Sequence, residues 1–281
     1  MAMIVAGVDG SASALTAVEY AAADAARRSA SLRIVHVRKL WTGVLPDRLN
    51  AAATSYGEEI LADARQRAHA CEPGVATTTD MATGDVVTWL KEEAVKAETT
   101  VIGSRGIGGF AGMLVGSVGL GLAGHAQGPV VVVREPTTRT TGRIVAGYDG
   151  TEEADTALDF AFAEAGRRGA RLKAIFSWQP PPFSSVSTMY DNLIHSVYEE
   201  RTTFVEQRFA TWPDRYPGVP VEYTHIYGHP VQVLSEESAA ADLVVAGSRG
   251  LNSFGAAVLG SVGHGLLHHA RCPVAIVTAT A

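Results

Sequence analysis

Two glycine-rich stretches have the composition and spacing of loops that bind phosphate. GSRGIGGFAGMLVGS runs from Gly103 to Ser117, and GSRGLNSFGAAVLGS runs from Gly247 to Ser261. Each follows an apolar run that predicts a buried strand, and both share the frame G-x2-G-x9-G-S. Glycine lets the backbone approach a ligand closely, and the N–H groups at the start of a helix favour an anion. The two stretches therefore predict phosphate loops, each of which leads into a helix at its closing G-S pair.

An aspartate follows the first predicted strand of each half of the chain. Asp9 stands in VDGS and Asp149 stands in YDGT. In a parallel sheet, ligands bind beyond the carboxyl ends of the strands, where the strand order reverses. We expect strands one and four to flank this point, so that Asp9 faces Gly103 and Asp149 faces Gly247. A carboxylate in this place suits ribose hydroxyls, or a metal ion held beside phosphates.

Close packing of a helix on a sheet is the simpler explanation for such glycines. It is favoured for the three that recur inside the helix after the first loop: Gly119, Gly121 and Gly124. Phosphate binding is favoured for the loop and the helix start because loop, helix start and aspartate occur together twice. These positions are Gly103, Gly106, Gly116 and Ser117.

The chain contains a tandem repeat of one sequence unit. The segment that starts IVAGVDG at Ile4 aligns without gaps to the segment that starts IVAGYDG at Ile144, an offset of 140 residues. The later segments VIGSRG and VAGSRG align at an offset of 144 residues, so the difference falls before Gly84 and Gly228. A chain of 281 residues is also long enough for two domains. We predict domains at 1–135 and 143–281, joined by a polar linker at 136–142.

Short apolar runs alternate with helical patterns in each unit. The predicted strands of the first unit are 3–8, 32–37, 75–81, 99–103 and 129–133, and its helices are 12–28, 51–70, 85–97 and 116–126. The second unit has predicted strands at 143–148, 171–177, 219–226, 242–247 and 273–278. Runs such as VVVV lack polar alternation, which is typical of strands buried on both faces. The pattern predicts two doubly wound α/β folds, each with a parallel five-stranded sheet.

Composition narrows the class of protein. Hydrophobic residues make up 47% and charged residues 19%, which indicates a packed core rather than disorder. The net charge is −6 and the arginines come in pairs, which argues against a nucleic-acid groove. The sequence has neither an apolar run of membrane-spanning length nor a signal-peptide pattern. Its two cysteines, Cys71 and Cys272, lack metal-type spacing. We expect a cytoplasmic protein with no membrane or nucleic-acid partner.

Several other residues are of types that could bind a ligand. His264 and His268 have the i, i+4 spacing of a metal pair, but histidines that meet the dipole at a helix end explain them better, so no metal site is predicted. Arg105 and Arg249 lie inside the two loops, where they would either contact phosphate or face solvent. The residues alone leave these two options open.

At these residues the chain resembles the universal stress protein family in its tandem, two-domain form. The frame G-x2-G-x9-G-S is similar to the ATP-binding signature of that family, and the early aspartate to its partner. The resemblance implies a sheet of order 3-2-1-4-5, with ATP and Mg²⁺ held between strands one and four. It also implies that domains pair through strand five. Here 130–133 and 274–277 would pair antiparallel within one chain, which hides two sheet edges.

The resemblance also implies the site residues. The first site comprises Asp9, Gly10, Ser11, Val37, Gly103, Arg105, Gly106, Gly116, Ser117 and Val118. The second site comprises Asp149, Gly150, Thr151, Gly247, Arg249, Gly250, Gly260, Ser261 and Val262. Val37 matches the position where family members hold adenine, whereas its counterpart Ser177 departs from the pattern. The spacers differ too, so the two sites need not have the same affinity.

Three functions are compatible with these residues. The first is an ATP-binding regulator of stress response or growth, with protein partners and self-association as a dimer. The second is a slow Mg²⁺-dependent ATP hydrolase, and the third is a scaffold that works through strand-five pairing. The chain has no GK[ST] sequence, and neither loop contains Lys, Asp or Glu. Binding is therefore better provided for than phosphoryl transfer, and no catalytic residue is predicted.

Overall fold

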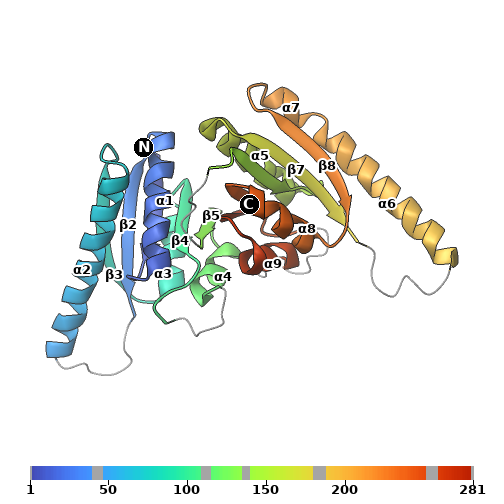
Figure 1. Cartoon of the computed structure of the whole chain (residues 1–281). Helices are drawn as coiled ribbons and strands as arrows, with labels where there is room; N and C mark the ends of the chain where they lie inside the picture. Colours follow the sequence, from blue (N-terminus) through green and yellow to red (C-terminus); the bar gives the residue numbers. More distant parts are fainter. Residues whose placement is uncertain are drawn as a thin grey trace.

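The computed structural model describes residues 2–39, 47–108, 115–134, 140–179, 188–250 and 259–279. Within them, ten strands form one sheet of order β3-β2-β1-β4-β5-β10-β9-β6-β7-β8 (Figure 1). Each half contributes five strands in the order 3-2-1-4-5, and neighbouring strands within a half are parallel. The prediction of two doubly wound α/β sheets is confirmed.

The first half alternates strands and helices as its apolar runs predict. Its elements are β1 (Met3–Val8), α1 (Ala12–Arg28), β2 (Ser31–Arg38), α2 (Asp47–Cys71), β3 (Thr77–Thr83), α3 (Val86–Ala94), β4 (Thr99–Gly103), α4 (Ser117–Ala123) and β5 (Gly128–Val133). β3 begins later than predicted because Val75 lies in a turn, where its N–H donates to the carbonyl of Glu72 (3.2 Å). The apolar side chain of Val75 suggested a strand, but the backbone at this residue still belongs to the turn.

The second half repeats this order with one addition. Its elements are β6 (Arg143–Gly147), α5 (Glu152–Arg168), β7 (Arg171–Trp178), α6 (Thr188–Phe209), α7 (Trp212–Arg215), β8 (Val221–Tyr227), α8 (Pro230–Glu237), β9 (Leu243–Gly247), α9 (Ser261–His269) and β10 (Val274–Thr278). α7 has four residues and lies in the interval where the offset between the halves grows. Its Trp212 is buried and stacks on Phe162 of α5, with ring centroids 5.9 Å apart.

Strand five joins the two halves. β5 and β10 pair antiparallel, with Val274 opposite Val132 and Val277 opposite Pro129. The predicted strand-five pairing therefore occurs within one chain, and it covers an edge of each half-sheet. Of the predicted linker, 136–139 lies outside the described residues. Gly142 at its end donates its N–H to Asp242 (2.8 Å).

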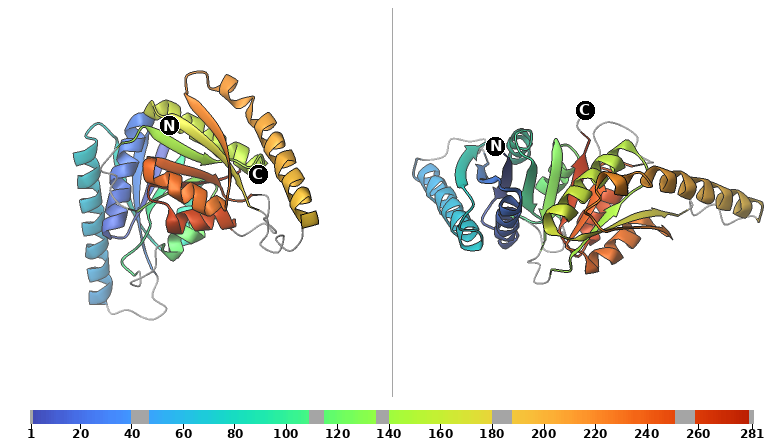
Figure 2. Two further views of the ribbon diagram at one scale, coloured as in Figure 1. Left: turned by 45° about the vertical axis from the view of Figure 1, so that its right-hand side comes forward. Right: turned by 90° about the horizontal axis from the view of Figure 1, so that it is seen from above.

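Helices cover both faces of the sheet (Figure 2). Residues of α1, α2, α5 and α6 share one apolar core, and residues of α3, α4, α8 and α9 share the other. β5 contributes to both: Val131 and Val133 lie in the first core, and Val130 and Val132 lie in the second. This explains why its sequence is continuously apolar. No helix in the described ranges combines the length and the apolarity needed to cross a bilayer.

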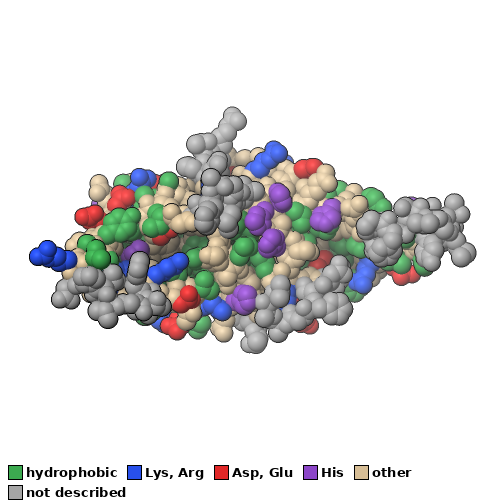
Figure 3. Space-filling model, turned by 90° about the horizontal axis from the view of Figure 1, so that it is seen from below, with side chains coloured by type: hydrophobic (Ala, Val, Ile, Leu, Met, Phe, Trp, Pro, Cys, Tyr) green, Lys and Arg blue, Asp and Glu red, His purple; other side chains and the backbone are tan. Residues whose placement is uncertain are grey.

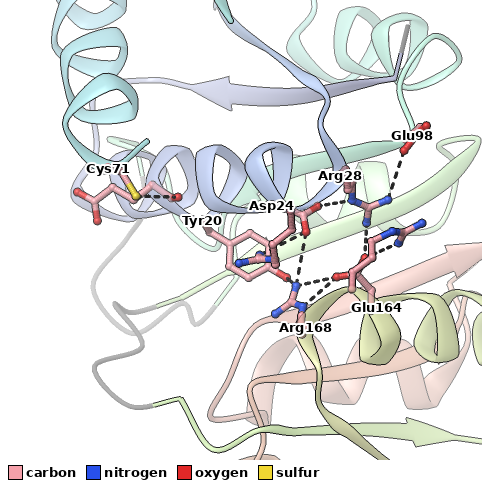
Figure 4. Close-up of polar contacts among 10 residues, drawn as sticks. Tyr20, Asp24, Arg28, Cys71, Glu98, Glu164 and Arg168 are labelled. Carbon is pink, nitrogen blue, oxygen red and sulfur yellow. Dashed lines mark hydrogen bonds and ion pairs between the residues drawn. The ribbon is translucent and has the colours of Figure 1, made fainter. Parts of the chain in front are cut away.

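A buried polar network fixes α1 against α5 (Figure 4). Arg28 on α1 binds Asp24 on its own helix (Nε to Oδ2, 2.8 Å) and Glu164 on α5 (Nη2 to Oε1, 2.6 Å). Arg168 on α5 binds Glu164 (Nη2 to Oε2, 2.8 Å) and donates to the Tyr20 hydroxyl (2.6 Å). We call these five residues the α1–α5 network.

The α1–α5 network follows the sequence repeat, because Asp24 aligns with Glu164 and Arg28 aligns with Arg168. Burial alone would raise the pKa of Glu164, but the charges of Arg168 and Arg28 outweigh it and hold that pKa below its usual value. Burial raises the pKa of Tyr20 to about 12, so its hydroxyl stays protonated at neutral pH. The network ties together the two helices whose opposite ends approach the glycine-rich loops.

Candidate functional site

The turn after β1 places a carboxylate at the start of α1. Asp9 Oδ1 accepts from the Ser11 N–H (3.0 Å), and Ser11 caps α1 by accepting from the Ala14 N–H (3.3 Å). Between them Gly10 has φ +88°, a backbone conformation that side chains disfavour. The D-G-S sequence therefore forms a tight turn and a helix cap together.

The second half builds the same turn. Asp149 Oδ1 accepts from the Thr151 N–H (3.1 Å), and Thr151 caps α5 by accepting from the Ala154 N–H (3.2 Å). Gly150 has φ +77°. The conservative exchange of serine for threonine keeps the cap, so both helices start in the same way.

The aspartate and the glycine-rich loop meet. Asp9 Oδ2 accepts from the N–H of Ile107 (2.8 Å), and a Cβ at Gly106 would lie 2.3 Å from the same oxygen. In the second half, a Cβ at Gly250 would lie 2.8 Å from Asp149 Oδ2. Contacts below 3.0 Å essentially never occur at a real Cβ. A side chain at this position would displace the aspartate carboxylate, so the contact between carboxylate and loop depends on a glycine here.

The first glycine of each loop lies against the start of a helix. A Cβ at Gly103 would lie 2.6 Å from the backbone N of Ala14 and from the backbone C of Ser13. A Cβ at Gly247 would lie 3.1 Å from the Glu153 carbonyl oxygen. The space at this position is taken by helix backbone, so packing by itself explains this glycine. A contact with phosphate here stays a prediction.

The end of each glycine-rich frame is tied back to its beginning. The Gly116 N–H donates to the Ser104 carbonyl (2.7 Å), and the Gly260 N–H donates to the Ser248 carbonyl (2.8 Å). Ser117 and Ser261 are exposed in the first turns of α4 and α9. The predicted loop and helix start are therefore adjacent in both halves. The spacers lie largely outside the described residues, at 109–114 and 251–258.

The position predicted to hold adenine differs between the halves. Val37 is 8% exposed and packs in the core that also contains α3 and α4. Ser177 instead donates its hydroxyl to the Gly228 carbonyl (2.8 Å). Val118 and Val262, which follow the frame, are partly buried against that same core. The first half thus presents an apolar side chain where the second presents a hydroxyl that is already bonded.

Two residues that contact the loops were not among those predicted from the sequence. The Ser13 hydroxyl donates to the Arg105 carbonyl and lies 3.3 Å from the Arg105 backbone N, which donates to it. Its counterpart Glu153 forms an ion pair with Arg249 (Nε to Oε1, 3.9 Å). The alignment at an offset of 140 residues places Ser13 opposite Glu153, and that difference was the available signal.

Of the three histidines of α9, His264 and His269 are exposed and His268 is partly buried. Histidine side chains lie near the middle of the face seen in Figure 3. The rings of His264 and His268 have centroids 4.7 Å apart, and burial together with the His264 charge lowers the pKa of His268. Among the residues described here, no three His, Cys, Asp or Glu side chains converge as metal ligands would.

Comparison with known proteins gives a consistent result across the chain. The model of the universal stress protein family matches residues 1–134 and again residues 140–278. The universal stress protein Rv2005c of Mycobacterium tuberculosis is 31% identical, over 97% of this chain and 96% of its own. Rv1996 of the same organism is 33% identical, over 97% of this chain and 94% of its own.

A solved structure shares the fold over nearly the whole length. A universal stress protein from Archaeoglobus fulgidus superimposes with a TM-score of 0.72 at 21% identity, over 98% of this chain and 96% of the other. That likeness concerns the fold alone, whereas the family matches concern the sequence of both halves. The chain belongs to the universal stress protein family and carries the family's domain twice.

Proposed function

We propose that each half binds one ATP between strands one and four, and that the bound nucleotide regulates how the protein acts in stress response or growth. The observation that carries the proposal is the contact between aspartate and glycine. Asp9 lies against Gly106 and Asp149 lies against Gly250, although the spacers that follow differ in sequence. Each half thus brings a carboxylate and a stretch of backbone without side chains to the same strand end, where one nucleotide could contact both.

The residues present fit a nucleotide. Asp9 supplies carboxylate oxygens for ribose hydroxyls or for Mg²⁺. The amide of Ile107, next to Gly106 in the loop, donates to Asp9 in this structure and would exchange that partner for a phosphate when nucleotide binds. Ser117 adds an exposed hydroxyl, whereas Val37 at the base position is 8% exposed and would offer adenine only a small apolar contact. Bound Mg²⁺ would offset phosphate charge. The corresponding residues of the second half are Asp149, Gly250 and Ser261.

The residue composition of the two glycine-rich loops favours regulation over hydrolysis. Fast phosphoryl transfer needs a cation on the transferred phosphate and a group that orients water. Each loop has a cation, Arg105 or Arg249, but neither stretch contains an Asp or Glu that could orient water, so binding is better supported than turnover. The third function, a scaffold using strand five, is disfavoured because β5 and β10 already pair with each other within the chain. We expect the partners to be adenine nucleotide, other proteins and a second copy of the chain in the cytoplasm.

The substitution Asp9→Ala is expected to weaken ATP binding in the first half about ten- to a hundredfold. This is the effect expected when one or two hydrogen bonds to a charged group are lost. The measurement is calorimetric titration of nucleotide-stripped protein with ATP and Mg²⁺. Asp9→Ala with Asp149→Ala should also remove the adenine nucleotide that denatured, freshly purified protein releases.

The matched control is Asp63→Ala on α2. Asp63 is half-exposed and lies 3.8 Å from Arg67 on its own helix, so its loss should leave ATP binding unchanged. If wild-type protein releases no nucleotide and gives no titration signal, the proposal is wrong. Equal affinity in Asp9→Ala and wild type would place the site elsewhere.

A further inference from the structure

The two halves differ in charge at one position that contacts the glycine-rich loop. Ser13 and Glu153 align, and each lies in the first turn of the helix after strand one. Each packs its backbone against the first glycine of the loop, Gly103 in one half and Gly247 in the other. The position is therefore equivalent in space as well as in sequence.

In the first half this position is neutral. The Ser13 hydroxyl donates to the Arg105 carbonyl, and the first turn of α1 contains no acidic residue. Arg105 is exposed, and its guanidinium forms no ion pair with any residue that the structure describes. Its charge is therefore available to an anion that binds at the loop.

In the second half the same position is acidic. Glu153 Oε1 lies 3.9 Å from Arg249 Nε, and the first turn of α5 contains two further carboxylates, Glu152 and Asp155. Arg249 is only partly exposed. The loop cation is thus compensated by a carboxylate of the chain itself, and the positive end of the α5 dipole is already met by acidic side chains.

The difference in charge between Ser13 and Glu153 predicts which half binds a triphosphate more weakly. A nucleoside triphosphate brings several negative charges, so a carboxylate beside the phosphate loop opposes its binding. The same ligand must also compete with Glu153 for Arg249, whereas Arg105 has no such competitor among the described residues. Divalent cation would reduce the penalty, and added salt would screen it.

We propose that Glu153 makes the second half the weaker and less phosphate-selective nucleotide site, and that Ser13 makes the first half the tighter triphosphate site. This inference rests on the proposed function, since it concerns the same two crevices. It identifies Glu153 as the residue that determines how strongly the affinity of the second site depends on the charge of the ligand.

The test isolates each site and then exchanges the charge. In a chain carrying Gly106→Val, which leaves the second site, Glu153→Gln should tighten ATP binding about tenfold, the effect of one partly screened charge. In a chain carrying Gly250→Val, which leaves the first site, Ser13→Glu should weaken ATP binding by a similar factor. Glu152→Gln is the graded comparison: Glu152 is exposed in the same turn and forms no ion pair with Arg249 among the described residues, so its gain should be smaller than that of Glu153→Gln.

Ligand charge separates an electrostatic effect from a structural one. The gain from Glu153→Gln should fall in the order ATP, ADP, adenosine, and it should shrink at high salt. An equal gain in affinity for adenosine would overturn the inference. So would equal ATP affinities of the two isolated sites, if Glu153→Gln leaves the affinity of the second site unchanged. Failure of both isolated sites and of wild type to bind ATP would instead overturn the proposed function.

Discussion

The substitution Gly106→Val is expected to weaken ATP binding in the first half at least about a hundredfold while the chain stays folded. A Cβ at Gly106 would lie 2.3 Å from Asp9 Oδ2, so the loop or the carboxylate must move away. Either shift separates the two groups that are proposed to hold ribose and phosphate, and a loss of two or more hydrogen bonds to charged groups is of this size. Calorimetric titration should then report one ATP per chain in place of two.

The control for this substitution is another glycine whose surroundings are open. Gly74 lies in the turn before β3, and a Cβ there would meet nothing within 4 Å. Gly74→Val should keep the stoichiometry of wild type. If Gly106→Val still binds two ATP with wild-type affinity, the crevice between β1 and β4 is not the nucleotide site.

The substitution Arg28→Ala is expected to lower the free energy of unfolding by about 3–5 kcal/mol. Arg28 has a side chain only 4% exposed and lies between Asp24 and Glu164, whose side chains are 2% and 1% exposed. Its removal leaves two buried carboxylates with less compensation, which is the costly way to break a buried ion pair. At about 2–4 °C per kcal/mol for a chain of this size, thermal unfolding should shift by roughly 10 °C.

An exposed ion pair between α1 and α2 provides the comparison. Arg67 on α2 binds Glu19 on α1 (Nη1 to Oε1, 3.1 Å), and its side chain is 47% exposed. Arg67→Ala should cost less than about 1 kcal/mol, as exposed pairs usually do. Equal destabilisation by the two substitutions would mean that burial of the α1–α5 network adds nothing to stability.

The fold was predictable because both halves of the sequence show the same alternation of apolar runs and helical patterns. Continuous apolar runs such as the one in β5 indicate burial on both faces, and the structure places Val130 and Val131 in opposite cores. The antiparallel pairing of β5 with β10 followed from the family resemblance and is also confirmed. The start of β3 was misplaced because the turn at Val75 depends on a backbone hydrogen bond that side-chain type does not reveal.

The sequence allowed us to predict which loops form the site but not which residues within them are in contact. The sequence placed Asp9 opposite the glycine-rich loop, and the structure brings Asp9 and Gly106 together. It did not show that Gly103 lies under the start of α1, because the same glycine suits a ligand or a helix backbone. The α1–α5 network was missed because the paired arginines were used only as an argument about charge distribution, and the sequence does not show which carboxylate each arginine meets.

A crystal structure of the chain with ATP and Mg²⁺ tests the central claim most directly. We expect a triphosphate against the loop at Gly106, with its ribose toward Asp9, and weaker density of the same kind beside Gly250 and Asp149. Nucleotide bound on another face, or side chains filling both crevices at millimolar ATP, would contradict the account.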